Sequence, residues 1–271
     1  MDADARSQAA RALSEAYETG KPIDPLIDTN PEMTLEDSYA IQLAQIEQRL
    51  AAGATIKGHK VGLTSAVMQR QMKVNQPDFG HLLDDMFYLE NSTIAASTFL
   101  QPRIEPEVAF VLKRPLRGPG VTVAEAAAAI DFVLPALELI DSRIRDWKIG
   151  ILDTIADNAS SGGIVLGSTP VGVGDVDLRL SGCVLYRNGE VIGTGAGGAV
   201  LGSPISSLVW LANTVGPLGI TLEAGHVVLP GSQTASFPVA AGDSFTAQFG
   251  GIGSVTTRFT NDDAATTQGA S

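Results

Sequence analysis

Cysteine is nearly absent from the sequence. Cys183 is the only one among 271 residues, so the chain cannot form an internal disulfide. Histidine is almost as rare, because only His59, His81 and His226 occur, and they are scattered along the chain. With one cysteine there is no zinc-binding pattern, so each histidine is interpreted as a polar or core residue rather than a metal ligand.

Positive charge is also in short supply. The chain has 18 lysines and arginines against 30 aspartates and glutamates, which gives a formal net charge of -12. A surface of this sign does not attract phosphate backbones or anionic lipids. Nucleic acids and membrane surfaces are therefore not expected partners.

Long apolar runs are missing too. The most alanine-rich stretch, AEAAAAIDFVLPAL, is interrupted by Glu125, Asp131 and Pro135 and falls short of the ~20 apolar residues that a membrane span needs. The opening stretch, MDADARSQAARALSEAYETG, lacks the basic start and the apolar segment of a signal peptide. We therefore expect no membrane-spanning segment and a cytoplasmic protein.

Helical signals dominate the first third of the chain. A stretch from about residue 5 to 17 is amphipathic, and a second helix is predicted to begin at Thr34, which stands in capping-box spacing with Asp37, and to stop at Gly53. Apolar residues recur within it at helical intervals and predict its buried face: Tyr39, Leu43, Ile46 and Leu50. A further short helix is predicted where Thr122 and Glu125 repeat the capping-box arrangement.

The second half of the chain is rich in short β-like runs. Asn188-Gly189 between two such runs is the strongest local signal for a β-hairpin, and one helix is predicted to begin at Pro204 after Ser203. With 44% hydrophobic residues the chain can bury a substantial core. We therefore expect a mixed, largely antiparallel sheet structure with helices around it, and a disordered tail over residues 262–271.

Two glutamates stand one residue apart in PRIEPEVAFVL, residues 102–112. In an extended strand Glu105 and Glu107 share one face, and that face becomes apolar within two residues. A solvated strand face is the simpler interpretation of such charges. Pro106, which cannot donate to a strand ladder, instead indicates an opening where a ligand can approach.

A third glutamate, Glu138, is the only charge in VLPALELI, residues 133–140. A lone carboxylate in an apolar run costs several kcal/mol unless it is compensated. An ion pair with Arg143 or Arg145 is one solution. Three carboxylates beside apolar strands are also the oxygen ligands that a divalent cation such as Mg²⁺ prefers.

Two further charged residues are candidates for chemistry. Lys60 lies in GHKVGLTS, where alternating apolar residues predict a buried strand. It can act as a cation for a substrate carboxylate or, with its pKa lowered by burial, as an acid or base. Asp78 follows Pro77 and precedes Phe79-Gly80, a turn signal, so a simple turn aspartate is the alternative interpretation.

Five stretches together resemble a known family. In order they are GHKVGLTS, QPDFGHLLDDM, QPRIEPEVAFVL, LPALELIDSRIRDWKI and DTIADNASSGG. Their sequence and spacing are similar to those of the 2-keto-4-pentenoate (2-hydroxypenta-2,4-dienoate) hydratases, which belong with the 4-oxalocrotonate decarboxylases to the fumarylacetoacetate hydrolase superfamily. The resemblance extends over roughly residues 10–259.

This resemblance implies an α+β fold, a mixed β-roll of the fumarylacetoacetate hydrolase type with an N-terminal helical region. The expected parts are a helical region packed on the core (1–62), a β-roll catalytic domain (63–261) and the tail (262–271). The resemblance also implies a homo-oligomer and allows a complex with a decarboxylase or aldolase of the same pathway.

The resemblance also assigns roles to residues. It implies Mg²⁺ or Mn²⁺ bound by Glu105, Glu107 and Glu138, catalytic roles for Lys60 and Asp78, and substrate contacts from Lys60, Ser160, Gly231 and Ser232. The expected reaction is the addition of water to a 2-hydroxy-2,4-dienoate, giving a 4-hydroxy-2-oxo acid in meta-cleavage catabolism of aromatic compounds.

Several alternatives remain open from sequence. The same metal site suits a 4-oxalocrotonate (2-oxo-3-hexenedioate) decarboxylase or a 2-oxohept-4-ene-1,7-dioate hydratase, although DSRIRDWKI favours a short substrate with a neutral tail. A non-catalytic subunit of a mixed complex and a sugar- or peptide-binding β domain are the alternatives from other classes. A sugar- or peptide-binding domain would not explain why a single carboxylate, Glu138, stands in an apolar strand.

Overall fold

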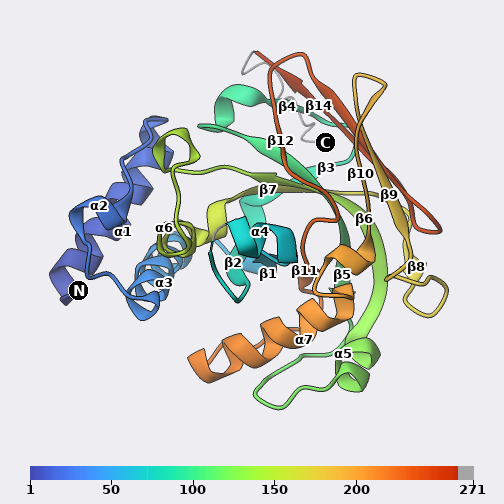
Figure 1. The fold of residues 1–271 in the computed structure, drawn as a ribbon, viewed down its shortest axis with the longest axis horizontal. Helices are drawn as coiled ribbons and strands as arrows, with labels where there is room; N and C mark the ends of the chain where they lie inside the picture. The colour runs from blue at the N-terminus through green and yellow to red at the C-terminus, as the bar shows by residue number, and fades with distance from the viewer. Residues whose placement is uncertain (72, 262–271) are drawn as a thin grey trace.

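Two β-sheets form the centre of the fold (Figure 1). The computed structural model describes residues 1–71 and 73–261. The strands of the larger sheet are β1 (Ile56–Gly62), β2 (Asp78–Leu83), β3 (Phe87–Leu89), β5 (Arg103–Leu112), β6 (Ile130–Ile140), β7 (Ser161–Leu166), β8 (Val171–Gly172), β11 (Val227–Leu229) and β12 (Phe237–Pro238). Their order is β2-β1-β11-β5-β6-β7-β3, with β12 paired to β5 and β8 to β6.

The smaller sheet packs against β6 and β7 of the larger one. Its order is β10-β9-β13-β14-β4, with bounds β4 (Thr93–Ala95), β9 (Gly182–Arg187), β10 (Glu190–Ala196), β13 (Ser244–Phe249) and β14 (Gly253–Thr260). The predicted hairpin is confirmed, because β9 and β10 pair antiparallel around Asn188 and Gly189. Both turn residues have positive φ, 52° and 85°, as the tight hairpin turn requires.

Helices gather at one end of the sheets and along one side (Figure 1). They are α1 (Ala3–Thr19), α2 (Leu26–Thr29), α3 (Leu35–Ala51), α4 (Ala66–Gln71), α5 (Val123–Ala129), α6 (Ile151–Ala156) and α7 (Pro204–Val215). The capping boxes at Thr34 and Thr122 are present, and α7 begins at Pro204 after Ser203, so these predicted helix starts are confirmed. Helices α1 and α3 pack on each other, and α3 packs on α6.

The buried face of α3 is rotated from the predicted one. Leu50 is 38% exposed, whereas the polar Gln42 is fully buried. The amide of Gln42 donates to the backbone oxygens of Phe79 and Ile155, at 2.9 and 2.8 Å. A buried amide that bridges two backbone carbonyls replaces an apolar contact, and hydrophobic spacing does not reveal such a residue.

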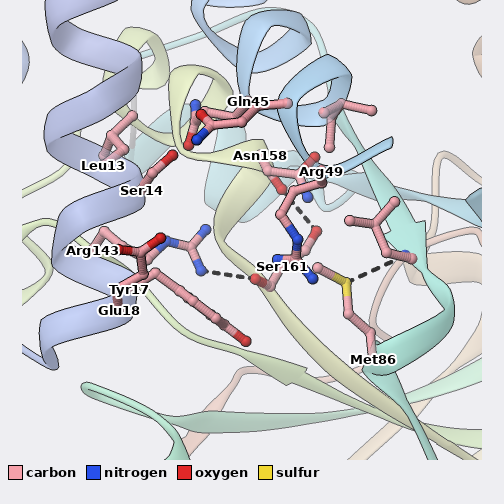
Figure 2. Close-up of a pocket in the computed structure, with 13 residues that line it drawn as sticks. Leu13, Ser14, Tyr17, Glu18, Gln45, Arg49, Met86, Arg143, Asn158 and Ser161 are labelled. Carbon is pink, nitrogen blue, oxygen red and sulfur yellow. Dashed lines mark hydrogen bonds between the residues drawn. The ribbon is translucent and has the colours of Figure 1, made fainter. Parts of the chain in front are cut away.

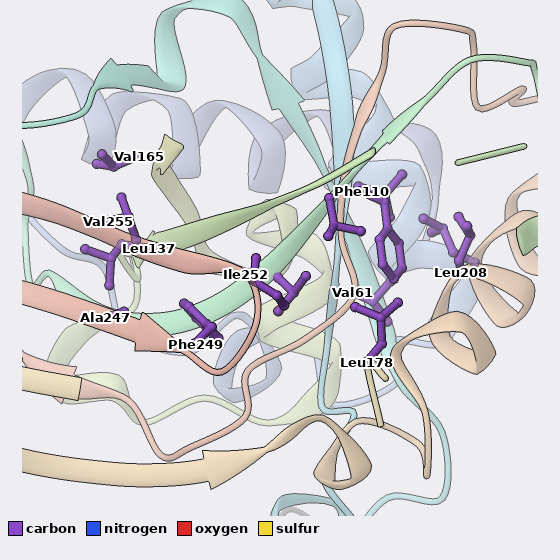
Figure 3. Close-up of a cluster of buried hydrophobic side chains, with 14 of the residues drawn as sticks. Val61, Phe110, Leu137, Val165, Leu178, Leu208, Ala247, Phe249, Ile252 and Val255 are labelled. Carbon is purple, nitrogen blue, oxygen red and sulfur yellow. The ribbon is translucent and has the colours of Figure 1, made fainter. Parts of the chain in front are cut away.

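The main core lies between the two sheets and α7 (Figure 3). It includes Phe110 of β5, Leu137 of β6 and Leu208 of α7, all fully buried. By length and composition alone, the helical stretch Gly197–Leu218 within the described residues would suffice for a membrane span. However, α7 itself has only 12 residues and buries one face in this core, so we interpret it as a core helix.

The predicted fold class is therefore confirmed: mixed sheets with an N-terminal helical region. Parallel pairs such as β1 with β11 occur beside antiparallel pairs such as β5 with β6. The expected boundary at residue 62 falls after β1, which is an inner strand of the larger sheet, so the division into parts stays a prediction. The predicted tail, 262–271, lies outside the described residues.

Candidate active site

The three glutamates meet on one face of the larger sheet. The register of β5 and β6 places Glu105 directly opposite Glu138, and Glu107 follows two residues along the same face. One carboxylate oxygen from each lies within 4.8 Å of the other two. Glu107 and Glu138 are 1% exposed and Glu105 is half-buried, so a solvated strand face does not explain Glu107.

The three carboxylates lie so close together that they can all be ionised only if a positive charge lies nearby. Burial, followed by repulsion from Glu138, raises the pKa of Glu105 to about 7. Burial, then Glu138 and Glu105, raises the pKa of Glu107 well above its ordinary value, although the backbone N–H of Gly231 donates to its Oε2 at 2.8 Å. Carboxylates so close together ionise together only when a cation neutralises them.

The donor set fits a hard divalent cation. The trio offers carboxylate oxygens and no nitrogen or sulfur, which suits Mg²⁺, Mn²⁺ or Ca²⁺ rather than zinc or copper. Oε1 of Glu138 is buried and makes no hydrogen bond of normal geometry among the described residues. A coordinated ion would satisfy it, and we infer a divalent cation site at this position.

The sequence alternative for Glu138, an ion pair with Arg143 or Arg145, is wrong. Arg143 forms a buried pair with Asp157, and Arg145 pairs with Asp24 at 3.0 Å. Glu138 instead lies next to Lys60, whose Nζ is 3.2 Å from its Oε1.

Lys60 lies on β1, an inner strand of the larger sheet next to its edge strand β2, and is 4% exposed. Burial alone would lower the pKa of Lys60, but the surrounding carboxylates, Glu138 first, outweigh burial and raise it above its ordinary value. Of the two roles that the sequence left open, the charged ammonium is the one that this environment favours.

Asp78 begins β2 opposite Gly62 and is buried, so it is not a simple turn residue. Its Oδ1 has no hydrogen-bond partner among the described residues. Burial raises its pKa, against the opposing effect of Lys60. A carboxyl group with a raised pKa next to a cation can hold a proton and release it, as a general acid must.

Gly62 makes room for both catalytic candidates. A Cβ at this position would lie 2.1 Å from Oδ1 of Asp78 and 3.5 Å from Nζ of Lys60. We expect Gly62→Ala to displace the Asp78 carboxyl and to lower kcat by about 10²-fold, the effect of misplacing a reacting group by ~1 Å. Steady-state kinetics measures this. Gly174→Ala is the matched control, because a Cβ there meets nothing within 4 Å, and equal losses in the two variants would contradict the prediction.

A cavity of about 180 Å³ opens onto these groups. Lys60, Asp78 and Glu105 line it, as do the predicted substrate contacts Ser160 and Ser232. The remaining hydroxyl residues of its wall were not predicted: Thr64, Ser65, Thr154, Thr234 and Ser236. Gly231 does not line this cavity, and its place in the structure is that of hydrogen-bond donor to Glu107.

A left-handed turn supports one wall of the cavity. Asn158, Ala159 and Ser160 all have φ near +50°, which is rare for residues other than glycine. The Asn158 side chain holds the turn to β2, accepting from the N–H of His81 at 2.8 Å and donating to its carbonyl at 2.9 Å. Strained backbone that tertiary contacts maintain is typical of functional sites.

A second cavity, of about 260 Å³, lies between α1, α3 and the larger sheet (Figure 2). It is the larger of the two, but neither the glutamates nor Lys60 nor Asp78 lines it. Its arginines already have partners, since Arg143 pairs with Asp157 and Arg49 with Asp85. The smaller cavity is therefore the candidate active site.

The histidines are not scattered in space. The ring centroids of His59 and His81 lie 4.9 Å apart, and those of His59 and His226 lie 5.8 Å apart. His59 and His81 are buried core residues, as predicted, and burial lowers the pKa of His81 to about 4. Cross-strand pairing brings them together on the sheet face opposite Lys60, a contact that linear spacing cannot show.

Comparison with known proteins gives consistent matches. The family profile for the fumarylacetoacetate (FAA) hydrolase C-terminal region matches residues 55–260. The chain is 47% identical to 2-keto-4-pentenoate hydratase of Paraburkholderia xenovorans (strain LB400), over 94% of both chains. It is 42% identical to 2-oxo-hept-4-ene-1,7-dioate hydratase of Escherichia coli, over 92% of this chain and 96% of that one.

Among solved structures, it is similar to 4-oxalocrotonate decarboxylase from Pseudomonas putida G7, complexed with magnesium and adipate. The TM-score is 0.92 and the identity 38%, covering 96% of this chain and 98% of the other.

Proposed function

The chain belongs to the fumarylacetoacetate hydrolase family, and from this premise we propose that it is a metal-dependent hydratase of 2-hydroxy-2,4-dienoates. The product is a 4-hydroxy-2-oxo acid, formed in the meta-cleavage catabolism of aromatic compounds. The observation that carries the proposal is the convergence of three carboxylates, two of them fully buried, beside a cavity that Glu105, Lys60 and Asp78 line. Relatives named as hydratases of such dienoates support it.

In this proposal Glu105, Glu107 and Glu138 would hold Mg²⁺ or Mn²⁺. When bound, the ion would supply Lewis-acid stabilisation of the negative charge that develops on the substrate. The protein excludes water from the buried side of the site, so these charges interact strongly with the protein.

The side chains then move the protons. The 2-hydroxyl loses a proton and C5 gains one, which leaves a conjugated ketone. Water next adds its oxygen to C4 while C3 gains a proton and the water loses one, so each step conserves protons. Asp78, with its raised pKa, is our candidate for giving the proton to C5, and the Lys60 ammonium orients the carboxylate or the attacking water. The hydroxyls of Ser160 and Ser232 bind the carboxylate end.

The first test is turnover of 2-hydroxypenta-2,4-dienoate by the purified chain, with Mg²⁺ and with excess chelator. We expect the ultraviolet absorbance of the dienoate to disappear with Mg²⁺, and the rate to fall by at least about 10²-fold in chelator, because Lewis-acid stabilisation is lost. Equal rates in the two buffers would contradict the metal assignment. Inactivity of the purified chain would favour the alternative that it is a non-catalytic subunit of a mixed complex.

A second candidate is decarboxylation of 2-oxo-3-hexenedioate, favoured by the similarity to the solved decarboxylase. The same stabilisation of charge on the C2 oxygen serves both reactions. Release of CO₂ without uptake of water identifies the decarboxylase, and water uptake without CO₂ identifies the hydratase.

The proposal includes a homo-oligomer located in the cytoplasm. Light scattering of the purified chain gives the subunit number. Co-purification with a decarboxylase or aldolase of the same pathway tests the expected complex.

A further inference from the structure

The cavity presents little positive charge to a substrate. Among the described residues that line it, Lys60 is the only basic one. Its ammonium already forms an ion pair with Glu138. Three large apolar side chains also line the cavity, and they come from segments that carry none of the candidate catalytic residues: Met68 of α4, Trp147 of η3 (Arg145–Trp147) and the following Ile149. This part of the wall suits an uncharged group.

A second cation, Arg103, lies close by but does not line the cavity. Arg103 stands two residues before Glu105 on the same face of β5. Its guanidinium lies 5.8 Å from the centre of the Trp147 ring, and its Nε and Nη2 donate to Oγ and O of Ser236, both at 2.8 Å. Trp147 and Ser236 line the cavity, whereas Arg103 does not. The indole ring and Ser236, which both contact Arg103, therefore line the cavity where the guanidinium does not.

Trp147 is held in this position by tertiary contacts. Both Asp146 and Trp147 have positive φ, 56° and 55°, a conformation with no local advantage for either residue. Gln101 anchors them: its carbonyl accepts from Nε1 of Trp147 at 3.0 Å, and its Oε1 accepts from the N–H of Asp146 at 2.8 Å. Two hydrogen bonds to Gln101 hold this strained segment, which indicates that the position of the Trp147 ring has a function.

We propose that Trp147 determines the substrate class by covering Arg103. With that charge covered, the cavity accepts 2-hydroxy-2,4-dienoates whose tail is neutral and rejects those that carry a second carboxylate. The physical reason is that a second carboxylate would be buried without a counter-charge, which is a strong form of discrimination. This inference rests on the proposed function, since it concerns the tail of that substrate.

The test compares two substrates that differ by one carboxylate, 2-hydroxyhexa-2,4-dienoate and 2-hydroxyhepta-2,4-diene-1,7-dioate. We expect the wild-type protein to favour the monoacid in kcat/KM. Trp147→Ala uncovers Arg103 and is expected to raise the ratio of diacid to monoacid kcat/KM by about tenfold or more, the effect of one charge-assisted hydrogen bond. Trp147→Phe keeps a ring over Arg103 and is expected to leave the ratio within about threefold of wild type.

The double variant Trp147→Ala/Arg103→Gln distinguishes the effect of the Arg103 charge from the effect of the extra room that the smaller side chain leaves. If the gain comes from Arg103, the double variant loses it. A gain that persists without Arg103, an unchanged ratio in Trp147→Ala, or a wild-type protein that does not discriminate would each overturn the inference. Circular dichroism establishes that each variant is folded.

A binding measurement keeps this inference separate from the proposed function. Titration calorimetry with 2-oxohexanoate and 2-oxoheptanedioate, in the presence of Mg²⁺, measures the same selectivity without turnover. A wild-type protein that turns over neither dienoate contradicts the proposed function. The affinity ratio in wild type and Trp147→Ala still decides the role of Trp147: a higher diacid preference in the variant supports it, and an equal ratio overturns it.

Discussion

Replacing Glu107 by glutamine is expected to reduce Mg²⁺-dependent turnover by roughly 10³-fold or more while leaving the fold intact. The substitution removes one of three converging carboxylates, and with it the charge that would hold a divalent cation. Glutamine keeps an oxygen that can accept from the N–H of Gly231, so the local hydrogen bond survives. Turnover assays and Mg²⁺ titration calorimetry measure both effects. Glu190→Gln on the exposed edge of β10 is the control.

The same variant should change stability in a pH-dependent way when no metal is present. Burial, then Glu138 and Glu105, raises the folded-state pKa of Glu107, so its contribution to stability is present at low pH and is lost as the pH rises through that pKa. Metal-free wild type is therefore expected to lose stability as the pH rises above the ordinary range of a glutamate, whereas Glu107→Gln loses less. Denaturant unfolding in chelator at pH 5, 7 and 9 measures the difference.

Two results would contradict this account of the trio. One is full activity of Glu107→Gln in chelator-treated buffer. The other is an unfolding free energy of the metal-free variant that falls with pH as steeply as that of wild type. Added Mg²⁺ should stabilise wild type by mass action, and it should stabilise the variant much less at the same concentration.

Lys60→Met is expected to have the largest effect on stability. Lys60 and Glu138 form a buried pair, 3.2 Å apart, and removal of one partner leaves the other charge uncompensated. Breaking such a pair costs about 3–5 kcal/mol in the free energy of unfolding. Loss of a positioned ammonium should also lower kcat by about 10²–10⁴-fold. Denaturant unfolding and steady-state kinetics measure the two effects.

Lys57→Met is the matched control for Lys60→Met. Lys57 lies on the same strand but is exposed, so its substitution should change stability by less than about 0.5 kcal/mol and leave kcat unchanged. Saturating Mg²⁺ is expected to restore part of the stability of Lys60→Met, because a cation among the glutamates compensates Glu138. A Lys60→Met protein as stable as Lys57→Met in chelator would show that the pair does not matter for folding.

Local sequence determined much of the secondary structure. The capping boxes at Thr34 and Thr122 and the Asn188-Gly189 turn all formed as predicted, because each depends on contacts within about four residues. The alternation of β5 placed Glu105 and Glu107 on one face for the same reason, since side chains two apart in a strand share a face. Together with the family resemblance, this was enough to predict the fold class.

Only the tertiary structure decided how the site is assembled. The register of β5 against β6 brings Glu138 opposite Glu105, and the pairing of β1 with β2 brings Lys60 and Asp78 to the same face. Register depends on the packing of whole sheets, so linear spacing could not distinguish Lys60 from the arginines as the partner of Glu138.

The same holds for the walls of the cavity. The positive φ of Trp147 and the left-handed turn at Ser160 are maintained by distant anchors, Gln101 and the backbone of His81. The sequence by itself supplied the candidate residues for the chemistry: the three glutamates, Lys60 and Asp78. Long-range hydrogen bonds and sheet packing decided which of them meet and which charge stays covered, because their energies depend on residues far apart in the chain.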